Sequence, residues 1–415
     1  MSPTNPFFDP RMRGFRDRAE VADVQALIDR RSAPLGSERG RASPGDRRVL
    51  AAPVIAEVPV PGFDRAAMDG YALRAEDTFG AGPYNSLELV VQGESMPGRP
   101  FGGTVHPGQA VRIMTGAPVP DGADAVLPVE QASEADGRLR VTEPVSPGRH
   151  VGRRGEDVTP GHEVLPAGRR LRPQDLALLL SIGVTEVSLV RRPAVEVLIT
   201  GDELLPAGSR PEGCRIVDSN SSMLAALALR DGAVVRHGAI LPDRRGAIRD
   251  ALLSSQADIV LVSGGSSVGQ EDHAPSLVAE LGELLVHGVA LRPAGPAGFG
   301  VIGERLVFML PGNPVSCLCA YDLFAGRAVR RMAGRSPEMP YPTARVPLAA
   351  KVSSAVGRVD YVRVRLRGGA AEPIAFSGAS LLSTTTAADG FLLVPRDLEG
   401  YPPGEVVPVH LYDLP

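Results

Sequence analysis

Residues 257–275 read ADIVLVSGGSSVGQEDHAP, an aliphatic run that ends at two glycines and continues into a polar loop. The run has the length and composition of a buried β-strand. Gly264 and Gly265 interrupt it, and a glycine loop after a strand often holds a phosphate group of a ligand. Glu271 and Asp272 follow within a few residues, although carboxylates repel anions. A divalent cation between the carboxylates and the phosphate would remove this conflict.

The same order of apolar run and polar loop recurs through residues 191–330. The expected strands are 193–200, 232–241, 257–265 and 305–310, and the expected helices are 221–232, 243–254 and 274–282. Such alternation predicts an α/β fold in which a parallel sheet has helices on both faces. Ligands bind sheets of this kind at the carboxyl ends of the strands.

Polar loops follow all four expected strands, and three of the loops carry a carboxylate. Asp202 and Glu203 follow the first strand, Asp243 the second, Asp272 the third, and the turn 311–316 (PGNPVS) the fourth. These loops would gather along one edge of the sheet, which predicts a phosphate-bearing ligand handled together with Mg²⁺. Each feature also has a plainer interpretation. Asp243 could cap the helix that follows, and the other acids and the PGNP turn could be ordinary turns.

The amino-terminal half has a different pattern. Residues 1–48 are rich in arginine, with a weak helical pattern over 21–28, and 31–46 have the composition of a flexible connection. Residues 49–149 alternate over short stretches between Pro-Gly and Asp-Gly breaks, which predicts a β-rich domain. Three stretches of this half, 63–73, 114–130 and 152–161, place acids beside glycines, and each alone is as typical of a turn as of a site.

Two further segments complete the expected organisation. Residues 173–183 predict a helix with Pro173 in its first turn and Gly183 beyond its end. From about residue 340 the sequence returns to short alternating strands, which predict a small β barrel or sandwich.

The composition excludes several classes of protein. The chain has 415 residues and a net charge of −4, which argues against a nucleic-acid partner. Lys351 is its only lysine and lies in LAAKVSS, so the phosphate loop that ends in Gly-Lys-Ser/Thr is absent. No apolar run approaches the roughly 18 residues of a membrane span, and the amino terminus lacks the apolar core of a signal peptide. We therefore expect a cytoplasmic protein without a membrane partner.

The cysteines and one histidine have plain interpretations. The three cysteines, Cys214, Cys317 and Cys319, form no disulfide pattern. Cys317 and Cys319 lie in an apolar stretch, where two small core residues on a helix are a better interpretation than a metal pair. His273 is expected to be a polar residue at the start of a helix.

Taken together, these segments resemble the molybdopterin molybdenumtransferases (the MoeA family) and the related E domain of gephyrin. The motifs AMDGYA, MTGAPVP with GADAV, RGEDV, TGDEL, GGxSVG with a following Asp, and LPGNPVS occur in the family's order. The resemblance extends from about residue 15 to the carboxyl terminus. Six motifs in order make it highly specific.

The resemblance implies four domains. An elongated dimerisation domain I would comprise 1–48 and 150–190, and a β-rich domain II would comprise 49–149. A molybdopterin-binding, three-layer α/β domain III with a parallel-type sheet would comprise 191–335, and a small β-barrel domain IV would comprise 336–415. The family also implies a homodimer in which domain III of one chain and domain II of the other form each active site.

The family reaction inserts molybdate into adenylylated molybdopterin. With Mg²⁺ the pyrophosphate bond is cleaved, AMP is released and molybdenum remains on the dithiolene sulfurs. These sulfurs belong to the substrate, so a shortage of cysteines is no objection. Further partners implied by this role are the molybdopterin adenylyltransferase and apo-molybdoenzymes or their chaperones.

The resemblance also assigns roles to individual residues. The expected catalytic residues are Asp69, Asp157 and Glu203, and the expected Mg²⁺ ligands are Asp202, Asp243 and Asp272. The residues expected to bind the molybdopterin substrate are Thr115, Gly264, Gly265, Ser266, Ser267, Gly269, Arg292, Pro311, Gly312, Asn313, Pro314 and Ser316.

One stretch departs from the family pattern. In LRPAGPAGFG (291–300), Arg292 keeps the first positive charge, but Gly295 stands where a second lysine often stands. The lost charge favours an alternative function, a non-catalytic molybdopterin-binding or scaffold protein of the same fold. The retained acids favour the enzyme, because a scaffold would not need them all. A tungstate-handling variant falls within the enzyme interpretation.

Overall fold

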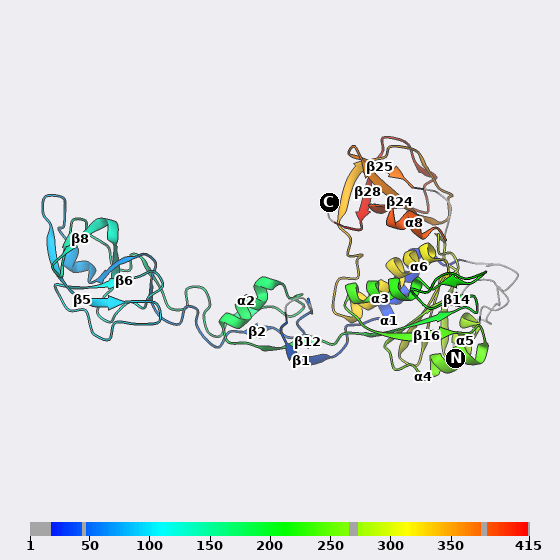
Figure 1. Cartoon of the computed structure of the whole chain (residues 1–415), viewed down its shortest axis with the longest axis horizontal. Coiled ribbons are helices and arrows are strands. Elements are labelled where there is room, and N and C mark those ends of the chain that lie inside the picture. Colours follow the sequence, from blue (N-terminus) through cyan, green and yellow to red (C-terminus); the bar gives the residue numbers. More distant parts are fainter. Residues whose placement is uncertain (1–17, 44–46, 265–272, 375–379, 414–415) are drawn as a thin grey trace. The chain divides into compact units, whose positions relative to one another are not determined.

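The computed structural model describes residues 18–43, 47–264, 273–374 and 380–413. The chain divides into two compact units, which are coloured by sequence in Figure 1. The first unit comprises 1–38, 47–49 and 188–415, and the second comprises 39–46 and 50–187. None of the helices in the described ranges is long and apolar enough to cross a membrane.

A six-stranded sheet forms the centre of the first unit. Its strands, in spatial order, are β16 (Val234–Leu241), β13 (Ala194–Thr200), β17 (Ile259–Ser263), β21 (Arg305–Leu310), β20 (Gly298–Ile302) and β18 (Glu283–His287). The first four are parallel, as predicted. The prediction of a parallel sheet is wrong for β20 and β18, which are antiparallel. Only two residues, Gly303 and Glu304, separate β20 from β21, and a connection this short permits only an antiparallel pair.

Side chains of the sheet alternate between two separate cores. In β17, Ile259 and Leu261 lie in one core, and Val260 and Val262 lie in the other. This is the period of two that a strand imposes on its side chains. Each core is covered by its own helices, which Figure 1 shows on the two sides of the sheet. The helices of the first core are α1 (Val21–Arg31), α3 (Asn220–Asp231), α6 (Pro314–Ala320) and α7 (Gly326–Met332), and those of the second are α4 (Arg245–Ser254) and α5 (Ala274–Leu281).

The amino-terminal helix α1 belongs to this first unit. Val24 and Ile28 are buried in the sheet core, and Arg327 donates two hydrogen bonds to the Asp29 carboxylate at 2.7 and 2.8 Å. The sequence prediction grouped this segment with 150–190. The apolar stripe of α1 packs against the sheet unit, where α7 supplies both apolar and charged partners, and the predicted domain grouping stays a prediction.

Strand β1 (Ser37–Arg41) lies within the segment that was expected to be flexible. That expectation is wrong for these five residues. They pair with β12 (Glu186–Val190), and the backbone hydrogen bonds of a two-stranded sheet give order to a sequence that has no apolar pattern.

The carboxyl-terminal part of the first unit forms a second sheet. Its strands are β19 (Leu291–Arg292), β24 (Val359–Arg367), β26 (Gly390–Val394), β28 (Val406–Leu411) and β22 (Thr343–Pro347), with β25 (Ala370–Pro373) paired to β24. A separate pair and a short helix accompany it: β23 (Val352–Ser353), β27 (Gly400–Tyr401) and α8 (Leu382–Thr386). The short strands are as expected. Their closure into a small β-barrel stays a prediction.

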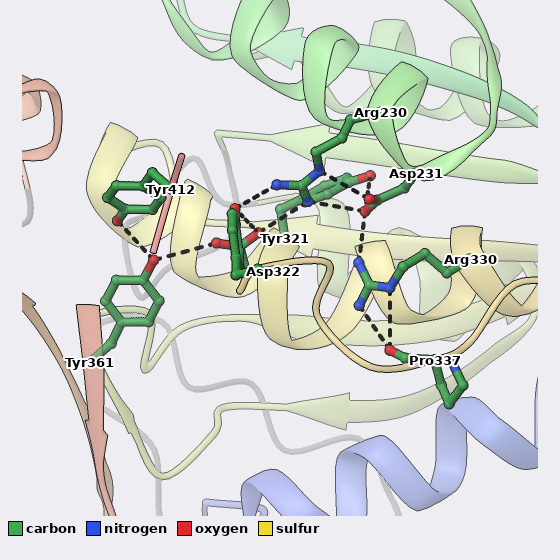
Figure 2. Close-up of polar contacts among 9 residues, drawn as sticks. Arg230, Asp231, Tyr321, Asp322, Arg330, Pro337, Tyr361 and Tyr412 are labelled. Carbon is green, nitrogen blue, oxygen red and sulfur yellow. Dashed lines mark hydrogen bonds and ion pairs between the residues drawn. The ribbon is translucent and has the colours of Figure 1, made fainter. Parts of the chain in front are cut away.

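A buried polar network, here called the Asp231–Asp322 network, links α3 to the π-helical turn η3 (Tyr321–Ala325) and to α7. Asp231 accepts hydrogen bonds from Arg330 Nη1 at 2.7 Å, Arg230 Nε at 3.0 Å and the Tyr321 hydroxyl at 3.2 Å. Arg330 also donates to the Pro337 main-chain oxygen, as Figure 2 shows. The network therefore holds the end of α3 to α7.

The other half of this network reaches the second sheet. The Asp322 carboxylate accepts from the Tyr341 hydroxyl at 2.9 Å and from Arg230 Nη2 and the Tyr361 hydroxyl, both at 3.4 Å. Tyr361 lies on β24, and its hydroxyl is 3.0 Å from that of Tyr412 (Figure 2). Burial raises the pKa of Asp322 to about 6, although Arg230 opposes the shift.

The second unit is built around another six-stranded sheet. In spatial order its strands are β7 (Ala125–Pro128), β4 (Gly70–Leu73), β6 (Gln109–Ile113), β5 (Leu87–Ser95), β9 (Arg138–Val141) and β8 (Ala132–Ala135). Two short pairs and two short helical turns accompany it: β2 (Val54–Ile55) with β11 (Glu163–Leu165), β3 (Arg65–Ala66) with β10 (Val151–Gly152), η1 (Ala75–Thr78) and η2 (Val129–Gln131). The prediction of short strands over this region is confirmed.

Helix α2 (Pro173–Ser181) of the second unit agrees with its prediction. It begins at Pro173, and Gly183 follows its end with a φ of 77°, a conformation that glycine adopts readily. The division of the chain into four domains stays a prediction.

Candidate functional site

The carboxyl ends of three parallel strands lie next to one another in the first unit. The register pairs Ile199 of β13 with Ser263 of β17, and Ser263 with Leu310 of β21. The loops that follow these strands therefore leave from one edge of the sheet, where ligands of α/β proteins bind.

Asp202 and Asp243 are joined by two reciprocal hydrogen bonds. The N–H of Asp202 donates to Asp243 Oδ2 and the N–H of Asp243 donates to Asp202 Oδ1, both at 3.3 Å. The sequence placed both acids at strand ends, and the structure brings them together. The alternative for Asp243 is not supported, because Arg244 is the residue that precedes α4 and no side chain caps this helix.

This carboxylate pair has the chemistry of a partial Mg²⁺ site. Mg²⁺ is commonly held by one or two carboxylates together with phosphate oxygens of a substrate. In the described part of the chain, no group of three or more Asp, Glu, His or Cys side chains could hold a metal ion by itself. The pair thus fits a cation that is shared with a bound phosphate. The third predicted ligand, Asp272, lies outside the described residues.

Glu203 lies on the exposed loop between β13 and β14 (Leu204–Leu205). The loop folds back at Gly201, where an added Cβ would lie 2.8 Å from Glu203 Oε2. The main-chain oxygen of Glu203 accepts a hydrogen bond at 3.0 Å from the N–H of Ile216, in β15 (Ile216–Val217). The backbone of Glu203 is therefore fixed while its side chain remains exposed.

Gly264 is the described start of the glycine loop. Its φ is 97°, and an added Cβ would lie 2.3 Å from the main-chain oxygen of Thr200. Only glycine fits where β13 and β17 approach so closely. The other predicted residues of this loop, Gly265, Ser266, Ser267 and Gly269, lie outside the described residues.

The PGNPVS turn connects β21 to α6. Pro311 is buried, Gly312 and Asn313 are exposed, and α6 begins at Pro314. Ser316 is 4% exposed and lies within α6. Gly312 and Asn313 are therefore the most accessible residues of this turn, Pro314 is half-buried, and the binding roles of the turn stay predictions.

Arg292 lies on β19, which pairs with β24 of the second sheet. Its Nη1 is 3.7 Å from the Asp360 carboxylate, which also accepts a hydrogen bond from Arg358 at 2.7 Å. Nearby, the position of Gly295 leaves room for a side chain, because the nearest atom to an added Cβ would be Leu291 O at 3.6 Å. The missing lysine therefore has no steric cause in the described structure.

In the second unit, Asp69 and Thr115 form a close pair. Asp69 Oδ1 accepts hydrogen bonds from the Thr115 N–H and from the Thr115 hydroxyl, both at 2.7 Å. These two bonds, the backbone one first, lower the pKa of Asp69 below its usual value. The structure thus brings together two residues, 46 positions apart, that the resemblance assigned to one site.

Asp157 lies on a loop of the second unit that is hydrogen-bonded to residues 60 and 61. The N–H of Asp157 donates to Val60 O at 3.0 Å, and Gly155 N–H donates to Pro61 O at 2.9 Å. The neighbouring acid, Glu156, accepts from the Arg153 N–H at 2.9 Å and from Arg65 at 3.2 Å. Glu156 thus stabilises the loop, while Asp157 is exposed.

Sequence reasoning missed the part that Asn220 plays at the sheet edge. Asp218, Ser219 and Asn220 stand at the start of α3, and all three are residue types that cap helices well. Asp218 does so by accepting from the Ser221 N–H at 3.0 Å, whereas Asn220 donates to Ser263 and to Gly312. The only sequence feature that could have indicated this role is that the start of α3 has more capping residues than one helix needs.

The cysteines and His273 agree with their plain interpretations. Cys317 and Cys319 are buried and free in α6, and Cys214 is free and exposed. Burial raises the pKa of the Cys317 thiol to about 12, so this thiol is not reactive. His273 immediately precedes α5.

Comparison with known proteins identifies the class of protein to which this fold and these loops belong. Three family models match in order: "MoeA N-terminal region (domain I and II)" over residues 19–183, "Probable molybdopterin binding domain" over 196–331 and "MoeA C-terminal region (domain IV)" over 345–412. The chain belongs to the MoeA family.

Particular relatives agree with this assignment. The molybdopterin molybdenumtransferase of Haemophilus influenzae is 33% identical, over 88% of this chain and 91% of its own. Molybdopterin molybdenumtransferase 2 of Mycobacterium tuberculosis is 36% identical, over 91% of this chain and 94% of its own. The crystal structure of the molybdopterin biosynthesis MoeA protein from Pyrococcus horikoshii is 32% identical, covers 95% of this chain and 100% of its own, and has a TM-score of 0.81.

Proposed function

We propose that this chain is a molybdopterin molybdenumtransferase, an enzyme that inserts molybdate into adenylylated molybdopterin and releases AMP. The observation that carries the proposal is the pairing of family-pattern residues across separate loops, Asp69 with Thr115 and Asp202 with Asp243. The relatives from Haemophilus influenzae and Mycobacterium tuberculosis, which match about nine-tenths of the chain, bear this enzyme name. A scaffold protein would not need Asp69, Asp202 and Asp243 all to be retained.

In the proposed reaction, water attacks the phosphorus on the molybdopterin side of the pyrophosphate link, and AMP leaves with the bridging oxygen. When the molybdenum of molybdate binds the two dithiolene sulfurs, one molybdate oxygen leaves as water with the two thiol protons. Bound Mg²⁺ would offset the phosphate charge beside Asp202 and Asp243. Asp69 remains ionised at neutral pH because its pKa is lowered, so it accepts hydrogen bonds from water or from a protonated oxyanion. Glu203, exposed beside the carboxylate pair, would accept a proton from the attacking water.

The finer features expected from the family form part of this proposal. They are the four-domain division, the β-barrel, the cytoplasmic location, the homodimer, and transient contacts with the molybdopterin adenylyltransferase and with apo-molybdoenzymes or their chaperones. Sedimentation of the purified chain tests the dimer. If residues of both subunits form each site, co-expressed Asp69→Ala and Glu203→Ala chains will recover activity in mixed dimers, and independent subunits will recover none.

The direct test follows AMP release from adenylylated molybdopterin in the presence of Mg²⁺ and molybdate. The enzyme will release AMP above the rate without protein. Tight molybdopterin binding without AMP release would support the scaffold alternative instead. Replacing molybdate by tungstate in the same assay identifies the preferred oxyanion.

A further inference from the structure

Asn220 connects two strand ends of the first unit with one side chain. It opens α3 and is 7% exposed. Its Nδ2 donates to the Ser263 hydroxyl at 2.9 Å and to the Gly312 main-chain oxygen at 2.7 Å. Ser263 ends β17 and Gly312 follows β21, so the amide reaches residues 43 and 92 positions away.

The helix does not need Asn220 as a cap. Asp218 accepts from both the N–H and the hydroxyl of Ser221, and its own N–H donates to Leu205 O at 2.9 Å. An asparagine at a helix start usually binds the local backbone. Here Asp218 has taken that role, and the Asn220 side chain is directed to the sheet edge.

The hydrogen bonds of Asn220 lie where the start of the glycine loop contacts the start of the PGNPVS turn. The Ser263 hydroxyl is also 3.4 Å from Pro311 O, and the Gly264 N–H donates to Leu310 O at 3.3 Å. A Cβ added to Gly312 would lie 3.6 Å from Gly264 Cα. The start of the glycine loop and the start of the PGNPVS turn are thus held together by Ser263 and Asn220.

The chemistry of these contacts requires an amide. A main-chain oxygen only accepts hydrogen bonds, so the amide nitrogen must face Gly312. The Asn220 Oδ1 and the Thr200 Oγ1, both buried, have no hydrogen-bond partner among the described residues. An aspartate at position 220 would place a carboxylate oxygen against the Gly312 oxygen, and the two would repel.

We propose that Asn220 is a positioning residue for phosphate binding. Through Ser263 and Gly312 it fixes the distance between Gly264 and the turn at Gly312–Asn313, and so sets the affinity for the phosphate-bearing part of adenylylated molybdopterin. This inference rests on the proposed function, which assigns both loops to that phosphate.

Steady-state kinetics of Asn220→Asp and Asn220→Ala test the inference. Loss of two buried hydrogen bonds will raise the KM for adenylylated molybdopterin about tenfold or more. The kcat and the KM for molybdate will change less than about twofold, because their determinants are elsewhere. A merely structural role would reduce the active fraction, and kcat would then fall with both KM values unchanged.

Ser221→Ala is the matched control, because it removes a hydrogen bond from the same helix start without touching either loop. Both of its KM values will equal those of the wild type. Should the Asn220 variants not fold, Ser263→Ala removes one acceptor of the same amide and will raise the KM for adenylylated molybdopterin about threefold. Wild-type KM values in every folded variant would overturn the inference.

Amide hydrogen exchange separates failure of this inference from failure of the proposed function. Peptides covering 306–316 will exchange faster in Asn220→Asp than in wild-type protein, while those of Ser221→Ala will not. If the wild type releases no AMP, the proposed function fails. If exchange of 306–316 is unchanged in Asn220→Asp, the positioning role of Asn220 fails whether or not AMP is released.

Discussion

Asp322 and Asp69 both accept a short hydrogen bond from a hydroxyl group, yet their pKa values shift in opposite directions. Asp322 is completely buried and its pKa rises to about 6, with burial as the main cause. Asp69 is exposed, and its pKa falls because the Thr115 N–H and hydroxyl stabilise the charged form. The surroundings of each carboxyl group, rather than its hydroxyl donor, decide which form is favoured.

If the proposed function is right, the two regions separate stability from chemistry. In the Asp231–Asp322 network the charged side chains are buried and paired, so removal of one leaves a buried charge without that partner. At Asp69–Thr115 and Asp202–Asp243, the carboxylates are bound by backbone N–H groups at loop ends. They are oriented without being covered, which suits groups that must meet a substrate.

The largest effect on activity is expected when an exposed carboxylate of the candidate site is removed. Asp69→Ala and Glu203→Ala will each lower kcat for AMP release by about 100-fold or more, as loss of a catalytic polar group does. Both variants will stay folded, with an unfolding transition close to that of the wild type, because both side chains are exposed. Glu88→Ala, an exposed acid on β5, is the control and will keep wild-type activity. If the Asp69 variant unfolds, the distinction between the exposed carboxylates and the buried Asp231–Asp322 network is wrong.

Loss of Asp231 will have the largest effect on stability. Arg330 is 3% exposed and donates to Asp231 at 2.7 Å, so Asp231→Ala leaves a buried charge without this partner. We expect a loss of about 3–5 kcal/mol in the free energy of unfolding, measured by urea titration with circular dichroism. Asp250→Ala, at an exposed position on α4, will cost less than about 0.5 kcal/mol. Equal losses in the two variants would contradict the role assigned to the network.

The Asp322→Asn variant tests the sign of the buried pKa shift. The folded pKa of about 6 lies above the ordinary 3.8, so folding favours the protonated carboxyl. Its contribution to stability is full below pH 3.8 and is lost as the pH rises through about 6. Asparagine does not ionise, so the stability of the variant relative to the wild type will rise by up to about 3 kcal/mol from pH 4 to pH 7. Thermal unfolding of both proteins at several pH values measures this change. A stability difference between variant and wild type that does not vary with pH would exclude the raised pKa of Asp322.

The smallest expected effect is at Gly295. Gly295→Lys fits without a steric clash and restores the charge of the family pattern. We expect the KM for adenylylated molybdopterin to fall about threefold, the size of a surface charge contact. Gly295→Gln has a similar length without the charge and will leave KM unchanged. Identical KM values for the lysine and glutamine variants would show that the lost charge is unimportant.

The sequence predicted the parallel strands because each is a largely apolar run of strand length between turn residues. It failed for β18 and β20, whose runs are short and, in β20, contain two glycines. The acids at the strand ends were predictable because the topology of parallel sheets gathers those ends. The Asp231–Asp322 network could not be predicted, because Arg230 and Tyr361 are 131 positions apart and no local sequence pattern relates them.

The candidate site shows the same limit. Asp69 and Thr115 were matched through family motifs, and no local rule relates an acid before β4 to a threonine after β6. Asn220 was missed because helix capping is the usual role of an asparagine at that place. Only the coordinates show that Asp218 already caps α3 and that the amide is bound to Gly312.

The most direct test of the central claim measures AMP release from adenylylated molybdopterin. The assay compares wild-type protein with Asp69→Ala, at equal concentrations of folded protein and in the presence of Mg²⁺ and molybdate. The wild type will release AMP well above background, and the variant will not, while their unfolding transitions coincide. AMP release at equal rates by both proteins, or by neither despite molybdopterin binding, would contradict the assignment of chemistry to the exposed carboxylates.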